Sequence, residues 1–400
     1  MRTVLTGRPL DEPAHVRAAL DDVLVSRAQP PMLVSLGEPT HGIAAFPLLR
    51  NDFLRHLVDR GYRSIALETD FFAAAAVDDY VAGGIAELDE VLATGFSHGF
   101  GYVPGNRDLV DWLRARNAGR PPADRVRFYG FDAPLEMSAA PNPRRFLTAV
   151  HDFLPAESRP VSADDLGALL GDDSGWTNPA AMVDPAVSIG ESDRARALRI
   201  VADDLASALR RAAPALSPTD PHAYHDAVAQ ARTAQGLLRY HAAMARPALD
   251  RIGTLLSHRA EMMADNLLDI AARERDRGPC LVFAHNVHLQ RAPSGMSFGP
   301  RPSSWWSAGA LVARTLGDRY VVIVSDANPQ SAPGTLQGLL AAATNRRTLF
   351  PVDELRAAPP ALGPDGPIVP GHIPLQQRDL AGADAVVFIA DTDGKRHQYW

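Results

Sequence analysis

The sequence predicts an α/β fold, namely a mainly parallel sheet that is flanked by helices and interrupted by a helical subdomain. Short apolar segments alternate with helical patterns in the first third of the chain, the middle is helical, and apolar segments return in the last third. Alternation of strand and helix is typical of parallel sheets, because each crossover between parallel strands needs a connection as long as a helix.

Six segments have the short apolar character of strands that are buried on both faces. They are Met32–Gly37, Ser64–Glu68, Arg125–Phe131, Cys280–Ala284, Tyr320–Val324 and Ala385–Ala390. Between the first three, apolar residues recur at helical spacing in Phe46–Arg60 and in Asn106–Asn117. The first third of the chain therefore predicts strands joined by helices that cover the sheet.

The middle of the chain lacks strand-like segments. The stretch Pro155–Pro185 is rich in Pro, Asp and Gly and predicts a long loop or short helices, and three long helical patterns follow it, at Arg194–Ala213, Tyr224–Ala245 and Ala248–Glu274. We therefore expect residues 1–140 and 279–400 to form two parts of one α/β core. Residues 141–278 would form a helical subdomain that makes one wall of a cleft.

Composition narrows the class of protein. The chain has 400 residues, of which 46% are hydrophobic, and this fraction favours a globular protein. Its net charge is -7, and no basic patch for binding nucleic acid is evident. No apolar run is long enough for a membrane span, and Met1–Val16 lacks the apolar region of a secretory leader. We expect a cytoplasmic protein with a small-molecule substrate. The oligomeric state is not indicated.

Polar residues with acid–base chemistry directly follow three of the predicted strands. Glu38 and His41 lie in the segment GEPTHG, Glu68 lies in LETD, and His285 and His288 lie in AHNVH. In open parallel sheets, functional groups gather at the carboxyl ends of the strands. If the three strands are neighbours, two carboxylates and three imidazoles converge on one site.

Each of these residues has a structural alternative. Glu38 could cap a helix, and His41 could be a loop histidine bonded to the backbone. Glu68 could form a buried ion pair with an arginine, since a buried charge needs a partner. His285 and His288 point to opposite faces if the segment is extended, whereas both can enter the site if the chain turns after Ala284.

These motifs resemble the erythromycin esterase family, which also includes proteins described as acting in succinoglycan biosynthesis. The resemblance lies in GEPTHG, in ALETD, in FAHNVH and in Arg50, nine residues after His41. It extends through Asn106–Asn117, Arg127–Asp132, Ser257–Leu267 and Gly309–Tyr320, in the family's order.

The resemblance implies hydrolysis of a macrolactone ester without a serine nucleophile, and it implies that His41 is the general base that activates water. A neutral histidine can take a proton from water near pH 7, and an adjacent carboxylate stabilises the imidazolium that forms. No metal or cofactor is expected. The catalytic residues that the resemblance implies are His41, Glu38, Glu68, His285, Arg50 and His288.

The chain departs from the family's pattern at positions that would contact the substrate. Ala45 replaces an acidic residue, Tyr102–Asn106 replaces an aromatic and basic stretch, and Phe71 replaces a tryptophan. We therefore expect a substrate other than erythromycin, such as another polyketide or secondary metabolite, in antibiotic resistance or biosynthesis. The candidate substrate-binding residues are Arg259, Phe71, Tyr102, Asn106 and Asn286.

Two other functions remain open at this stage. The same acid–base residues could catalyse elimination or acyl transfer in a biosynthetic pathway, because they move protons in either reaction. The histidine nitrogens and carboxylate oxygens of these residues could also be ligands of zinc, iron or haem.

Overall fold

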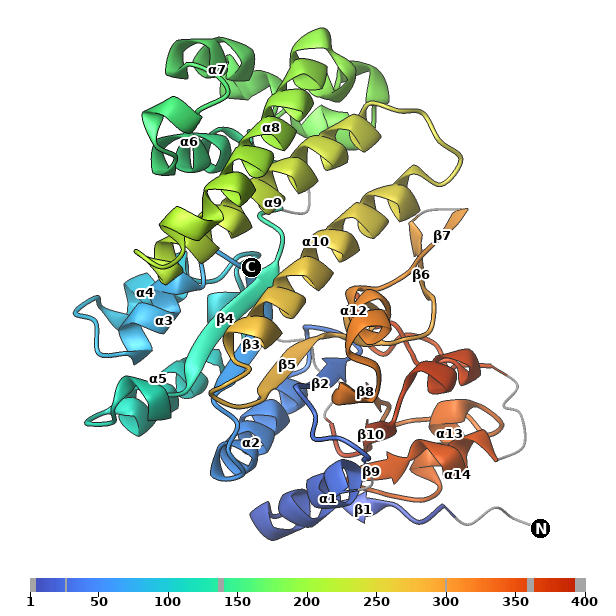
Figure 1. Ribbon diagram of the computed structural model, residues 1–400. Coiled ribbons are helices and arrows are strands. Elements are labelled where there is room, and N and C mark those ends of the chain that lie inside the picture. Colours follow the sequence, from blue (N-terminus) through green and yellow to red (C-terminus); the bar gives the residue numbers. More distant parts are fainter. Residues whose placement is uncertain (1–4, 26, 136–139, 299–300, 358–362, 393–400) are drawn as a thin grey trace. The chain divides into compact units, whose positions relative to one another are not determined.

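The computed structural model describes residues 5–25, 27–135, 140–298, 301–357 and 363–392. The chain divides into two compact units, which are coloured along the sequence in Figure 1. One comprises residues 1–132 and 267–400 and contains the main sheet, and the other comprises residues 133–266. The helical subdomain's place beside a cleft stays a prediction.

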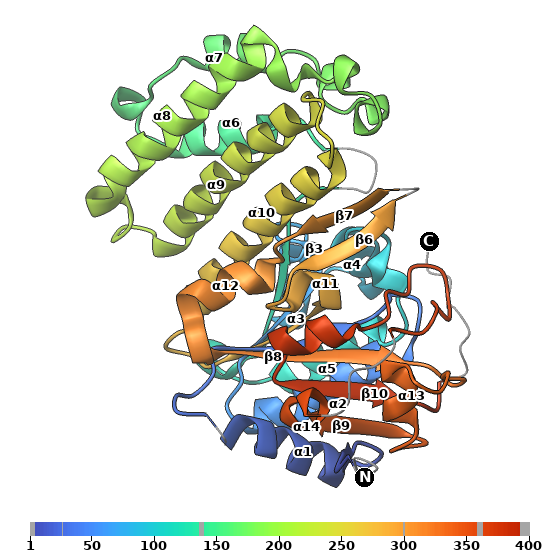
Figure 2. The ribbon, with the colours of Figure 1, turned by 90° about the vertical axis from the view of Figure 1, so that its right-hand side faces the viewer.

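The first unit is built around an eight-stranded sheet (Figures 1 and 2). Six adjacent strands, from β10 to β4 in the sheet order, are parallel, whereas the two at one edge, β1 and β9, pair antiparallel. In sheet order the strands are β1 (Arg8–Pro9), β9 (Arg347–Pro351), β10 (Ala385–Ile389), β8 (Tyr320–Ala327), β2 (Leu33–Glu38), β5 (Cys280–His285), β3 (Ser64–Asp70) and β4 (Arg127–Asp132).

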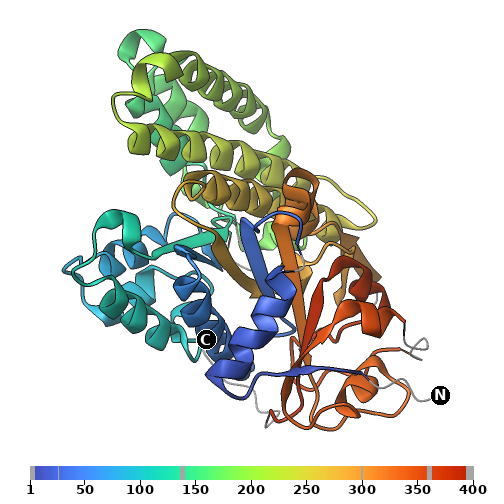
Figure 3. The same cartoon turned by 60° about the horizontal axis from the view of Figure 1, so that its bottom comes forward.

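Helices cover the sheet, because the parallel strands are apolar on both sides. Side chains from α1, α2, α3, α4 and α5 form one continuous core with alternate residues of β2, β3, β5, β8 and β10. Figure 3 shows the helices of this part of the chain, in blue and cyan, beside the sheet. The helices of this unit are α1 (Pro13–Val25), α2 (Ala45–Asp59), α3 (Ala75–Val81), α4 (Leu88–Thr94), α5 (Asn106–Asn117), α11 (Asn286–Leu289), α12 (Ala308–Leu316), α13 (Leu336–Ala341) and α14 (Val352–Arg356). A separate hairpin consists of β6 (Ser294–Phe298) and β7 (Arg301–Trp305).

The second unit is helical. Its helices are α6 (Arg144–Phe153), α7 (Ala163–Leu170), α8 (Asp193–Leu216), α9 (Pro221–Met244) and the first part of α10 (Arg251–Arg273), which ends in the first unit. No strand occurs between residues 140 and 279 of the described chain. No helix of the described residues is long and apolar enough to cross a membrane.

The predicted parallel sheet, flanked by helices and interrupted by a helical region, is confirmed. The sequence missed the antiparallel edge formed by β1 and β9. β1 has only two residues, and β9 is a five-residue strand that ends in Pro351. Edge strands bury less apolar surface than central ones, so their sequence pattern is weak.

Candidate active site

The three strands that end in acid–base residues are direct neighbours, in the order β2, β5, β3. Glu38 pairs in register with His285, and Leu67, the residue before Glu68, pairs with Phe283. Because all three strands are parallel, their carboxyl ends meet at one edge of the sheet. The convergence that the sequence predicted for Glu38, Glu68 and His285 is therefore present.

His41 lies in the turn between β2 and α2 and is bonded to Glu38. Its Nδ1 is 2.7 Å from Glu38 Oε1, and its side chain is 23% exposed, whereas Glu38 is 4% exposed. An ionised carboxylate can only accept, so Nδ1 carries a proton, and in the neutral ring Nε2 is then the proton acceptor. This is the tautomer that a general base needs.

Burial shapes the acidity of Glu38. Desolvation raises the pKa of its carboxyl, while the hydrogen bond from His41 and the positive charge of Arg50 act in the opposite direction. Its second oxygen, Oε2, is buried and has no hydrogen-bond partner among the described residues. One acceptor of this carboxylate is thus committed to the imidazole, and the other is unsatisfied.

Glu68, 5% exposed, connects the three histidines. Its Oε2 accepts a hydrogen bond from the backbone N–H of His285 at 2.9 Å, and its Oε1 lies 3.2 Å from His288 Nε2. The same Oε1 is 3.8 Å from His41 Nε2, which is too far for a direct hydrogen bond. These contacts join Glu68 to the histidines of the site.

His285 is held neutral by the backbone. Its Nε2 donates to the carbonyl of Pro39 at 2.8 Å, and its Nδ1 accepts from the N–H of Val287 at 3.2 Å. Burial lowers the pKa of His285 to about 3, and the nearby His41 adds to this effect. Both ring nitrogens are thus bonded to the backbone, and the predicted catalytic role of His285 stays a prediction.

His288 reaches the same site because the chain turns. The four-residue helix α11 begins at Asn286, so His285 and His288, three residues apart, lie on the same side. The extended alternative is therefore excluded. His288 is 6% exposed, and its Nδ1 has no hydrogen-bond partner in the described part of the chain.

Arg50 lies beneath the site and not at its mouth. Helix α2 begins at Ala45, so Arg50 is on its second turn, and it is 1% exposed. Its guanidinium donates to Asn51 Oδ1 at 2.8 Å and to Asn106 Oδ1 at 2.8 Å, and it lies 5.0 Å from the centre of the Phe283 ring. Burial lowers the pKa of Arg50 to about 9, and Glu38 opposes that shift. These contacts make Arg50 a counter-charge for Glu38, and its part in catalysis stays a prediction.

Glu38, His41, Arg50 and Glu68 line a small cavity of about 20 Å³. That volume slightly exceeds the roughly 10–15 Å³ that one water needs. Its lining residues are Glu38, His41, Arg50, Leu67, Glu68, Phe96, Phe100, Val103, Asn106, Phe283 and Ala284. The cavity suits a water beside the carboxylates, while a larger substrate would approach from the exposed side of His41.

A wider hollow of about 440 Å³ lies in the helical unit, but its chemistry differs. Its residues are Arg196, Arg199, Ile200, Ala202, Asp203, Gln235, Leu238 and Arg239. They include no histidine paired with a carboxylate. We place the candidate active site at the small cavity because the acid–base groups are there.

Asn286, a predicted substrate contact, is bonded to strand β8. Its Nδ2 donates to the carbonyl of Ser325 at 2.7 Å, its Oδ1 accepts from the N–H of Ser325 at 3.1 Å, and the residue is 2% exposed. A Cβ at Gly37 would lie 2.2 Å from Asn286 Oδ1, so glycine is needed there. Asn286 therefore joins α11 to β8, and its contact with a substrate stays a prediction.

The other predicted substrate contacts are dispersed. Asn106 lines the cavity, but its amide is bonded to Arg50 and to the carbonyl of Phe100. Tyr102 is 63% exposed, and Phe71 packs edge-on against Phe72; neither lines the cavity. Arg259 lies on the part of α10 that belongs to the second unit, so its contact with a substrate stays a prediction.

Sequence reasoning missed Phe100, which lines the cavity beside His41, and His98, which packs against Phe100. The Phe100 ring lies 4.7 Å from the His41 ring and 5.4 Å from the His98 ring, and His98 Nε2 is 3.1 Å from Asp132 Oδ2. His98 is the one residue other than glycine with a positive φ, 57°, among the described residues. The Gly-rich segment SHGFGY was the only available signal, and it did not distinguish a site from a loop.

Other nucleophiles do not fit. A Gly-x-Ser-x-Gly pattern that sequence reasoning passed over occurs at Gly295–Gly299, but Ser297 is an exposed residue of the β6–β7 hairpin and not of a strand-to-helix turn. Cys280 is fully buried, and burial raises the pKa of its thiol. No group of three or more His, Cys, Asp or Glu in the described residues could hold a metal ion.

The fold and the site define an α/β protein with a histidine–carboxylate centre at the carboxyl edge of a parallel sheet. The chain belongs to the erythromycin esterase family, whose profile matches residues 57–362, and family membership supports hydrolase activity. The match begins after His41, so GEPTHG lies outside it. No curated protein matches this chain.

Solved structures share the fold. A protein from Bacillus cereus has a TM-score of 0.70 at 17% identity, with 96% of this chain and 94% of that chain covered. The erythromycin esterase EreC, a histidine-to-asparagine mutant in its open conformation, has a TM-score of 0.68 at 19% identity, with 98% of each chain covered. A succinoglycan biosynthesis protein has a TM-score of 0.62 at 16% identity, with 98% and 95% covered.

Proposed function

We propose that this protein hydrolyses an ester or macrolactone of a polyketide or another secondary metabolite, with His41 as the general base. The observation that carries the proposal is the 2.7 Å bond between His41 Nδ1 and Glu38, made by an imidazole that is 23% exposed beside a cavity large enough for water. Positioned general bases typically contribute about 10²–10⁴-fold to the rate.

The proposed reaction uses this geometry. His41 Nε2 takes a proton from water while the water oxygen bonds to the acyl carbon, and Glu38 stabilises the imidazolium. The tetrahedral intermediate then collapses, the ester C–O bond breaks, and His41 returns the proton to the leaving oxygen. Glu68, 3.8 Å from Nε2, adds negative charge that favours the protonated ring.

The proposal includes a reaction without metal. His285 has both ring nitrogens bonded to the backbone, so it cannot act as a ligand without losing these contacts. The test is elemental analysis after dialysis, and stoichiometric retained metal would contradict this part of the proposal.

The experiment for the reaction itself is hydrolysis of a panel of macrolactones and simple esters by wild-type protein and by His41→Ala. Mass spectrometry of the products distinguishes the chemistry, since hydrolysis adds one water and elimination removes one. The proposal predicts gain of water by wild type and loss of activity in the variant. Elimination or acyl transfer by wild type would show that the same centre catalyses a different reaction.

A further inference from the structure

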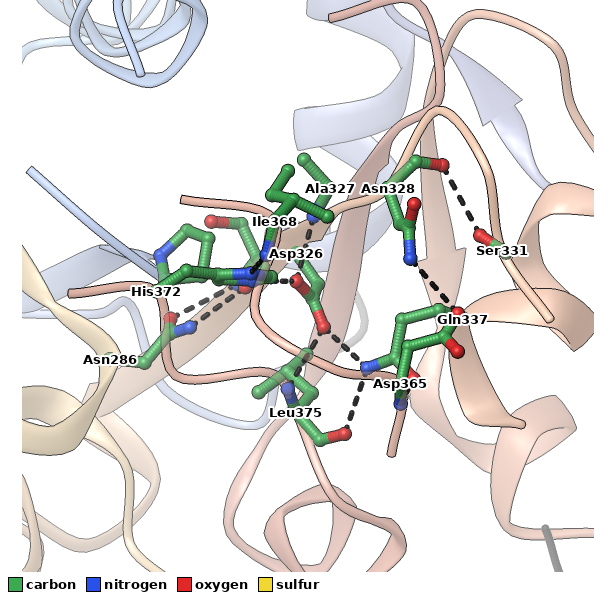
Figure 4. A network of polar contacts seen from close by, with 12 residues as sticks. Asn286, Asp326, Ala327, Asn328, Ser331, Gln337, Asp365, Ile368, His372 and Leu375 are labelled. Atoms are coloured by element: carbon green, nitrogen blue, oxygen red, sulfur yellow. Dashed lines mark hydrogen bonds and ion pairs between the residues drawn. The ribbon is translucent and has the colours of Figure 1, made fainter. Parts of the chain in front are cut away.

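A second histidine–carboxylate pair lies at the end of strand β8, outside the cavity. Asp326 is fully buried and accepts four hydrogen bonds, which Figure 4 shows. Its Oδ1 accepts from His372 Nε2 at 2.8 Å and from the N–H of Ala327 at 2.8 Å. Its Oδ2 accepts from Gln337 Nε2 at 2.6 Å and from the N–H of Leu375 at 2.8 Å. A buried carboxylate with four donors is saturated and has no capacity for a ligand.

These bonds hold the segment 363–376 against the sheet. His372 Nδ1 accepts from the N–H of Ile368 at 3.1 Å, so the ring is neutral, with its proton on Nε2. Gln337 on α13 accepts from the N–H of Asp365 at 2.9 Å and donates to the carbonyl of Leu375 at 2.9 Å. Asp326 and Gln337 therefore fix both ends of this segment, as Figure 4 shows.

The fixed segment contacts the loop that carries His41. The N–H of Ile373, between His372 and Leu375, donates to the carbonyl of Pro39 at 2.9 Å. The same carbonyl accepts from His285 Nε2 at 2.8 Å. Pro39 follows Glu38 directly and precedes His41 by two residues, so these two donors fix the backbone between the base and its carboxylate.

We propose that Asp326 and His372 are positioning residues for the active site: they hold Ile373 so that its N–H fixes the carbonyl of Pro39 and hence the geometry of Glu38 and His41. The kinetic part of this inference rests on the proposed hydrolase function. A small displacement of a reacting group can lower a rate by about 10²-fold, so the pair affects turnover without touching the substrate.

The experiment compares four variants with wild type. His372→Leu removes the donor to Asp326, whereas His372→Gln keeps an amide that can donate to it. Ile373→Pro removes the N–H that bonds to Pro39 and leaves Asp326 intact; Ile373 already precedes Pro374, which favours extended backbone at this position. His56→Leu is the matched control, because His56 is 7% exposed and bonds to Asp21 at 3.1 Å, away from Pro39.

We expect His372→Leu and Ile373→Pro to lower kcat by about 10- to 100-fold with little change in KM. His372→Gln should recover most of kcat, and His56→Leu should keep it. Equal kcat in Ile373→Pro and wild type would overturn the proposal, as would an equal loss in His56→Leu.

Hydrogen exchange provides a readout that needs no activity. Backbone amides of residues 40–45 should exchange faster in His372→Leu and Ile373→Pro than in wild type, and unchanged exchange would overturn the proposal. If wild type hydrolyses no ester, the proposed function fails, and hydrogen exchange still decides whether the pair positions this loop.

Discussion

Two histidine–carboxylate pairs lie at the carboxyl ends of neighbouring strands. They differ in whether all of their hydrogen-bonding atoms have partners. Glu38, the partner of His41, is the last residue of β2, and Asp326, the partner of His372, is the last residue but one of β8. Their N···O distances are nearly equal, 2.7 Å and 2.8 Å. The His41 side chain is 23% exposed, and Glu38 has an unpartnered oxygen among the described residues, whereas the His372 side chain is 1% exposed and Asp326 has four donors.

The comparison shows that distance alone does not identify a catalytic pair. An unsatisfied buried acceptor costs about 1–3 kcal/mol, so it persists where surrounding structure compensates for it. Such a group can still bind water or substrate. A saturated pair stabilises one arrangement of the chain and cannot take part in proton transfer without breaking it.

The strongest test of this comparison is His41→Ala. We expect hydrolysis to fall by about 10²–10⁴-fold, because the general base is lost, with little change in stability, because the ring is partly exposed. Measurements of kcat/KM and of thermal unfolding check both parts. His15→Ala, an exposed histidine on α1, is the control and should retain activity. Full activity of His41→Ala would remove the pair from the mechanism.

Asn286→Ala tests the structural side of the same edge. Removing the amide leaves the N–H and the carbonyl of buried Ser325 without their partner, so we expect a loss of about 2–4 kcal/mol in the free energy of unfolding. Asn117→Ala is the matched control, since Asn117 makes equivalent backbone bonds to Val126. Urea unfolding should show similar losses for both. A direct substrate role for Asn286 would instead appear as a higher KM with unchanged stability.

Glu38→Gln separates the charge of the carboxylate from its position. Loss of a charge-assisted hydrogen bond worth about 1.5–3 kcal/mol predicts a fall in kcat of about 10- to 100-fold. Burial raises the pKa of the Glu38 carboxyl, so neutralising this residue should also relieve an unfavourable buried charge and increase thermal stability near pH 7. A variant with wild-type kcat would show that the charge is dispensable.

The pH dependence of stability tests His285. Burial lowers the pKa of His285 from 6.5 to about 3, so between these values the unfolded chain binds more protons than the folded one. Stability contributed by the neutral ring is present above pH 6.5 and is lost as the pH falls, by about 2 kcal/mol at pH 5. Urea unfolding of wild type and His285→Gln at pH 7 and pH 5 measures this. An equal loss in both proteins would contradict the assignment.

The smallest effect is expected for Tyr102→Ala. Tyr102 is 63% exposed, so its replacement should change stability by less than about 0.5 kcal/mol. Measurement of KM for the substrate then tests the predicted substrate contact. Measurement of kcat with a small ester serves as the reference for the reaction itself. An unchanged KM would remove Tyr102 from the binding surface.

Local patterns determined much of this protein. Apolar segments identified the six parallel strands, and helical periodicity gave α5 with its observed bounds, Asn106–Asn117. The positions of Glu38, Glu68 and His285 after strands were enough to predict that they meet, because parallel strands place their carboxyl ends at one edge. The repeat of apolar residues that is typical of a strand or a helix involves consecutive residues, so it can be recognised in the sequence alone.

Tertiary structure decided which polar groups remain available. The orientation of Asn286 depends on Ser325, 39 residues away in the sequence. The carbonyl of Pro39 accepts its hydrogen bond from His285, 246 residues away. The turn at α11, the burial of Arg50 and the saturation of Asp326 likewise depend on the order of strands in the sheet. A sequence specifies which donors and acceptors exist, but only the packed chain determines which of them find partners and which keep an open site.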